Sequence, residues 1–490
     1  MPETINIKSD EIACIARGQA VVEARQTLDR ECRILSASAC AVTTPSEVFA
    51  GEARYIGKVR FDTLVLADGK IECISEIAEF SDKITSPAIT AGTAITLVPE
   101  IVNVEATLEG GALKTVAVVD TSAIAVVSDE HNCIAAPEDG IYSETRTVEY
   151  CTVCAEQAET VYVTDSIAAP KLNEVICVSS RAVVTSAEAA DGEVKVTGSL
   201  YTNAVVRGDD GTVSTCKAVT PFIKSISAPG AHDGNNAFAT AAVTETNGTL
   251  IQGEDRLELS ATVNITVKAL DCRTAQAVVD VFCADNELEV TSGTTKCSRC
   301  EPMITVTDTV DGQIPLPADK LAADNVLCVG GTFCTLSDIK VDGRVTAEGL
   351  IGGDIIYYNA ENNAVDTLAF RLPFSIPLAV HTDCANVYGT ATVTDVNVRV
   401  RRESVFDIKA DVAFTLWLSD GSECSIVESV KLGEPIERPN ATVIIHIAKP
   451  GETLWQAAKA LCCSPERVQQ QNDKTAPYEG GERLINFCNK

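Results

Sequence analysis

Residues 258–270 read ELSATVNITVKAL, and apolar and polar side chains alternate along nearly the whole stretch. Residues 116–127 (VAVVDTSAIAVV) and 407–418 (DIKADVAFTLWL) have a similar alternation. Successive side chains of a β-strand point to opposite faces of its sheet, so a period of two is typical of a strand with one buried face. We therefore predict a half-buried strand at each of these stretches.

Each stretch closes a longer segment that occurs three times. The copies open on the apolar runs RILSASACAVTT, EVICVSSRAVVT and NVLCVGGTFCTL. A glycine follows Ile34, Ile176 and Leu327 of these runs by 23, 22 and 22 residues, and a phenylalanine follows each glycine by 23, 24 and 25 residues. The markers are Gly57, Gly198 and Gly349, and then Phe80, Phe222 and Phe374. Agreement at two intervals predicts three copies of one folded unit.

The copies are rich in β-branched residues, and Asp-Gly pairs such as those at 68–69 and 191–192 separate their apolar runs. This pattern predicts a mainly β protein of three sandwich-like or barrel-like domains. The predicted domains and connectors are residues 1–128 (the first unit with an N-terminal lead), 129–168 (connector), 169–271 (second unit), 272–318 (connector), 319–434 (third unit) and 440–490 (a small C-terminal module). Because the connectors carry matching runs, we expect them to contribute strands.

The C-terminal module changes pattern. An apolar run at 443–447 predicts a strand, and Thr453 is a candidate cap for a helix whose apolar positions repeat every three to four residues. Ser464 followed by Pro465 predicts the start of a second helix. A last apolar run at 484–487 completes a predicted strand–helix–helix–strand module of the α+β class.

Two resemblances follow from these motifs. The run KPGETLW at 449–455, with Asn472, Gly481 and the apolar pair at 484–485, resembles the LysM family, although Glu452 stands in place of the commoner aspartate. The run VTAEGLIGGDIIYY at 345–358 is similar to the centre of the SPOCS domain of spore-coat-associated proteins. Three such units before one LysM module resemble the SipL-type spore morphogenetic proteins.

The resemblance implies a non-enzymatic scaffold that is made in the mother-cell cytoplasm and surrounds the forespore surface. It implies that the LysM module tethers coat proteins by binding the coat-base ATPase, a spore coat morphogenetic protein. The alternative is a cell-wall or cortex protein that binds peptidoglycan or another N-acetylglucosamine glycan. In either case, the family places ligand contacts in a groove, here at Gly451, Glu452, Thr453, Leu454, Asn472, Tyr478 and Gly481. For Trp455 we expect core packing.

The charge and hydropathy of the chain exclude some classes of partner. The formal net charge of −30 repels nucleic acid, so no nucleic-acid partner is expected. The sequence contains no run of about 18 consecutive apolar residues, so we expect no membrane insertion. The first residues lack the basic and apolar regions of a signal peptide, which predicts cytosolic synthesis.

Twenty cysteines are many for a reducing compartment. Cys151 and Cys154 form one CxxC motif, and Cys297 and Cys300 form another. Three interpretations stay open: a zinc site, disulfide chemistry, or structural thiols; a shared zinc site would require the two connectors to meet. The four histidines are isolated, and no nucleophile or phosphate-loop motif is present, so we expect no catalytic residue, no cofactor and no enzymatic activity.

Overall fold

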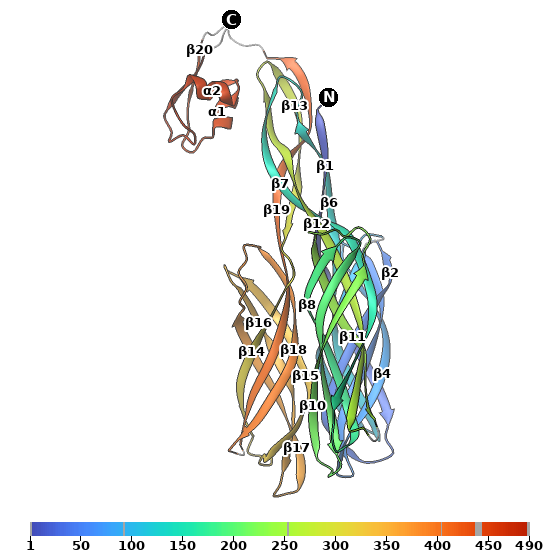
Figure 1. The fold of residues 1–490 in the computed structure, drawn as a ribbon. Coiled ribbons are helices and arrows are strands. Elements are labelled where there is room, and N and C mark those ends of the chain that lie inside the picture. The colour runs from blue at the N-terminus through green and yellow to red at the C-terminus, as the bar shows by residue number, and fades with distance from the viewer. Residues whose placement is uncertain (1, 92–93, 252–253, 403, 437–442, 488–490) are drawn as a thin grey trace.

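The protein is mainly antiparallel β-sheet in the computed structural model, which describes residues 2–91, 94–251, 254–402, 404–436 and 443–487. Two short helices near the C-terminus are the only helices among these residues. The predicted mainly β class is therefore confirmed. Figure 1 shows a narrow upper part, broader groups of strands below it, and the small helical module beside the upper end.

The first repeat pairs two three-stranded sheets. Its first and last strands, which are the longest, lie next to each other in one sheet, and three consecutive strands form the other sheet. The sheet orders are β1-β6-β5 and β2-β3-β4. The strands are β1 (Glu3–Thr27), β2 (Cys32–Phe49), β3 (Glu52–Ala67), β4 (Lys70–Thr85), β5 (Ile95–Glu109) and β6 (Ala112–Ala136).

The second repeat has the same strand order, with sheets β11-β12-β7 and β10-β9-β8. Its strands are β7 (Ile141–Ala168), β8 (Leu172–Ala190), β9 (Glu193–Gly208), β10 (Val213–Ser227), β11 (Asn236–Ile251) and β12 (Arg256–Cys283). The strand β12 contains residues 258–270, and the alternate residues from Leu259 to Ala269 are at most 3% exposed. The predicted half-buried strand is thus confirmed here.

The third repeat differs in its first strand, which is interrupted so that β13 and β14 both pair with β19. Its sheets have the orders β13-β19-β14, joined by β18, and β15-β16-β17. The strands are β13 (Asn286–Cys300), β14 (Ile304–Pro315), β15 (Asn325–Val341), β16 (Val345–Asn359), β17 (Ala364–Pro377), β18 (Asn386–Arg401) and β19 (Val405–Pro435). The segments expected to connect the units, 129–168 and 272–318, are therefore largely strand.

The glycine and phenylalanine markers of the three copies are cross-strand partners. Gly57 pairs with Phe80, Gly198 with Phe222, and Gly349 with Phe374. In each pair a Cβ atom on the glycine would lie within 2.6 Å of the phenylalanine ring. The ring thus covers the glycine backbone of the neighbouring strand, which explains the repeated spacing.

Six strand segments form what we call the stalk: residues 3–12, 127–136, 141–153, 270–283, 286–300 and 419–435. Side chains from all three repeats share its core, including Ile7, Cys133, Val148, Ala277 and Ile426. Figure 1 shows the stalk as the narrow upper part, with the paired sheets below. The three repeats are thus joined through one common core.

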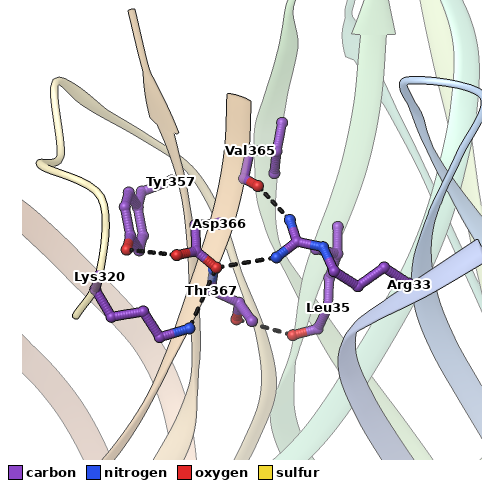
Figure 2. A network of polar contacts seen from close by, with 7 residues as sticks. All are labelled: Arg33, Leu35, Lys320, Tyr357, Val365, Asp366 and Thr367. Carbon is purple, nitrogen blue, oxygen red and sulfur yellow. Dashed lines mark hydrogen bonds and ion pairs between the residues drawn. The ribbon is translucent and has the colours of Figure 1, made fainter. Parts of the chain in front are cut away.

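A polar network also joins the first and third repeats (Figure 2). The carboxylate of Asp366, of which 9% is exposed, lies 3.1 Å from Arg33 and 3.2 Å from Lys320. The hydroxyl of Tyr357 donates to the same carboxylate at 3.2 Å. Thr367 donates to the carbonyl of Leu35 at 2.8 Å, so the contact includes backbone of the first repeat.

Candidate functional site

The C-terminal module consists of β20 (Val443–Ile447), α1 (Leu454–Leu461), α2 (Pro465–Gln471) and β21 (Arg483–Phe487), with β20 antiparallel to β21. The Thr453 hydroxyl accepts a bond from Gln456 N–H, and the Gln456 side chain accepts one from Thr453 N–H, which makes a capping box. Ser464 caps α2 by accepting from Arg467 N–H at 3.2 Å. The predicted order of elements and both predicted caps are present.

The two loops that line the predicted groove lie side by side. The Gly451 N–H donates to the Tyr478 carbonyl at 2.8 Å, and the Tyr478 N–H donates to the Glu452 carbonyl at 3.0 Å. The Gly481 N–H donates to the Ala448 carbonyl at 2.8 Å. The structure thus brings the residues before α1 next to those after α2.

Two of the predicted groove side chains, those of Glu452 and Tyr478, are nevertheless buried. Tyr478 is only 2% exposed and lies in the core of the module. Asn472 donates to the carbonyls of Val468 and Ile485 and accepts from the Ile485 N–H, so it joins α2 to β21. The groove residues Gly451, Thr453 and Gly481 are exposed, and Leu454 is half-buried. A ligand in this groove would therefore meet mainly backbone and small side chains.

Glu452 is buried and charged. Burial raises the pKa of its carboxyl, but hydrogen bonds from the Lys449 N–H and from His446 lower it by more than burial raises it. The net pKa therefore lies below the usual value. The His446 ring nitrogen lies 2.8 Å from the carboxylate. Glu452 therefore holds the loop before α1 against β20, and its side chain is 8% exposed.

Trp455 packs in a core, as expected, but part of that core comes from the stalk. Its ring lies against Phe282 of β12 at a centroid distance of 4.9 Å, and its indole N–H donates to Asp280 at 2.8 Å. Lys459 pairs with the same carboxylate at 2.8 Å. The helix α1 thus docks on the stalk. Local sequence patterns did not indicate this contact, because Asp280 and Trp455 are 175 residues apart.

The two CxxC motifs do meet, through one cysteine each. The sulfur of Cys300 lies 3.5 Å from that of Cys151. A third residue completes the group: Cys272, which belongs to no CxxC motif, forms a disulfide with Cys151 and lies 3.3 Å from Cys300. Sequence reasoning missed Cys272, because only the register of β7 against β12 places it opposite Cys151.

The other two motif cysteines lie elsewhere. Cys154 has its sulfur 3.3 Å from the carbonyl of Ala269 and 3.4 Å from the Asn235 side chain. Cys297 packs in the stalk core, near Cys133 and Cys424. The four CxxC cysteines therefore do not form one site, and a shared group needs Cys272.

Comparison with models of protein families, with curated proteins and with solved structures found no match to this chain. Among the described residues, neither helix has the length and apolar character needed to cross a membrane.

Proposed function

We propose that this chain is a non-enzymatic scaffold of the spore envelope, in which the LysM-like C-terminal module binds a coat morphogenetic protein at the forespore surface. The proposal rests on the LysM-like and SPOCS-like motifs together with one observation. The module lies beside the tip of the stalk, away from the paired sheets of the three repeats (Figure 1). A module in that place can contact a partner while the sheets contact other proteins.

The alternative function is direct binding of an N-acetyl-glycan by the same module. The adjacent loops before α1 and after α2 favour it, because Gly451 and Gly481 leave the groove floor accessible. The burial of Tyr478 is less favourable, since an exposed aromatic ring that could pack on a sugar face is missing from the described part of the groove. We therefore rank the protein partner first.

Affinity capture from sporulating cells tests the proposal, with the full chain compared with a chain that ends at residue 436. The full chain should retain a coat-layer protein that the shorter chain loses. A parallel pull-down on purified peptidoglycan separates the alternatives: retention of the full chain on glycan alone would contradict the scaffold proposal.

A pair of point variants locates the surface. Thr475→Arg changes an exposed residue in the loop after α2, and Gln470→Arg changes an exposed residue on α2 itself. The first should weaken capture of the partner, and the second should leave it unchanged. Equal capture by both folded variants would show that the groove is not the binding surface.

A further inference from the structure

Three cysteine sulfurs from three strands meet where the stalk joins the second repeat. Cys151 of β7 and Cys272 of β12 are direct cross-strand partners with a Cα–Cα distance of 4.1 Å. Cys300 is the last residue of β13 and lies 3.3 Å from the Cys272 sulfur and 3.5 Å from that of Cys151. Cys151 is buried, Cys300 is half-buried and Cys272 is exposed, so the group is accessible from solvent on one side.

We propose that Cys151, Cys272 and Cys300 bind one thiophilic metal ion of the Zn²⁺ or Cu⁺ type when the Cys151–Cys272 bridge is reduced. The site has two mutually exclusive states, one with a disulfide and a free thiol and one with three thiolates around a metal ion. This inference does not depend on the proposed function.

The near-equal distances from Cys300 to the two bridged sulfurs support a shared ligand. A thiol placed for exchange with a disulfide attacks along the S–S axis, so it lies about 2 Å farther from the second sulfur than from the first. Here the two distances are 3.3 and 3.5 Å, which places Cys300 beside the bond. Three thiolates on one metal with metal–sulfur bonds of about 2.3 Å have sulfurs roughly 3.8–4.0 Å apart. On reduction the Cys151 and Cys272 sulfurs must therefore separate by about 2 Å from their bonded distance, whereas the Cys300 sulfur needs to move by only about 0.5 Å.

A neighbouring amide supplies hydrogen bonds to the sulfurs. The Asn236 Nδ2 atom lies 3.4 Å from the Cys300 sulfur and 3.7 Å from the Cys272 sulfur. Its orientation is fixed, because the same nitrogen donates to the Cys300 carbonyl at 2.9 Å. Amide N–H groups around metal thiolates stabilise the anionic sulfur and orient the ligands. Asn236 is thus a positioning residue for the proposed site.

A dithiol reductant of the thioredoxin class can open the Cys151–Cys272 disulfide. The reductant supplies two electrons and two protons, the Cys151–Cys272 bond breaks to two thiols, and the reductant becomes a disulfide. Metal binding then displaces three protons, one from each thiol. Because each thiol loses its proton on binding the ion, metal occupancy should increase with pH.

The test measures metal binding by the full-length protein under a phosphine reductant. Native mass spectrometry counts bound Zn²⁺ or Cu⁺, and Co²⁺ gives a thiolate charge-transfer band. Cys272→Ser and Cys300→Ser should each remove one equivalent of metal and reduce the Co²⁺ band. The matched controls Cys154→Ser and Cys297→Ser change the other CxxC cysteines and should keep that equivalent. Cys177→Ser reports separately on a second group, Asp62, Cys73 and Cys177.

Asn236→Ala should keep the stoichiometry but weaken metal affinity by about 10-fold to 100-fold. Circular dichroism establishes that each variant is folded. The proposal is overturned if Cys300→Ser binds as much metal as the parent, or if Cys154→Ser loses the same equivalent. It is also overturned if alkylation shows that the bridge stays closed under reductant in the folded protein.

Discussion

Asp366 is the carboxylate that links the third repeat to the first. Burial raises its pKa, but the Thr367 N–H, Lys320 and Arg33 lower it by more than burial raises it. The net pKa therefore lies below the usual value. A depressed carboxyl pKa stabilises the folded state above the unfolded pKa of about 3.9. That stabilisation is lost as the pH falls through the folded pKa.

Replacing Asp366 should therefore weaken the contact between repeats. We expect Asp366→Asn to lower the local free energy of opening of β2 and β17 by about 1–3 kcal/mol at neutral pH, as measured by hydrogen exchange. The matched control is Glu79→Gln, because the Lys58–Glu79 pair is exposed on both sides and should contribute nothing measurable. The difference between Asp366→Asn and the parent should vanish at a pH below the folded pKa. A difference that persists there would contradict the electrostatic explanation.

Replacing the glycine markers by alanine should cost stability by different amounts in different repeats. A Cβ atom at Gly198 would lie 2.3 Å from the Phe222 ring and 2.6 Å from the Val183 carbonyl oxygen. At Gly57 the three nearest atoms all belong to the Phe80 ring, which is half-buried and can move. Gly198→Ala should thus cost about 1–3 kcal/mol, and Gly57→Ala should cost less. Thermal unfolding of both variants measures this, and equal costs would show that the backbone carbonyl is not the obstacle.

Local sequence signals predict individual elements well in this chain. The capping residues Thr453 and Ser464 and the alternation at 258–270 act over a few residues, so periodicity and side-chain chemistry reveal them. The interruption between β13 and β14 is different: Pro302 is a residue that breaks strands, but it does not indicate that the two halves pair with one partner strand. Only pairing of both strands with β19 shows that they correspond to β1 and β7.

The docking of α1 on β12 depends on the charge of Asp280. Burial raises the pKa of Asp280, but the hydrogen bonds from Lys459 and Trp455 together lower it by more, so the net pKa lies below the usual value. Docking should therefore hold above a pH of about 4 and weaken as the pH falls through the folded pKa of Asp280.

We expect Asp280→Ala to detach the module from the stalk. The chain has two tryptophans, so an NMR spectrum of indole N–H groups contains two side-chain signals. The Trp455 signal should move toward the position of a solvent-exposed indole, and the Trp417 signal should stay as an internal control. An unchanged Trp455 signal would mean that Phe282 alone holds the module in place.

Because the stalk core is shared, the three repeats of the molecule should unfold cooperatively. Ile7 is fully buried and contacts a core that contains residues of all three repeats. Ile7→Ala should cost about 2–5 kcal/mol and reduce hydrogen-exchange protection in β7, β12, β13 and β19 as well as β1. Val21→Ala on the same strand is the control, because Val21 is 68% exposed. Loss of protection confined to β1 and β6 would contradict a shared core.

This common core could not be predicted from the sequence. Glu3 pairs with Ala136, a residue more than a hundred positions away in the sequence, and no short-range period encodes this pairing. The repeated spacing predicted the three copies but assigned the N-terminal lead no partner. Cys272 and Asp280 were missed for the same reason, since their roles depend on contacts that exist only after the long strands pair.

The pairing of strand β19 affects how the molecule responds to mechanical tension. It runs from the sheets of the third repeat through the stalk, and β13 and β14 pair with it over most of its length. Antiparallel hydrogen bonds lie across the strands, so tension along β19 strains them in shear and all together. A force applied between the C-terminal end of β19 and the sheets would be distributed over the whole ladder, so this strand should extend little under tension.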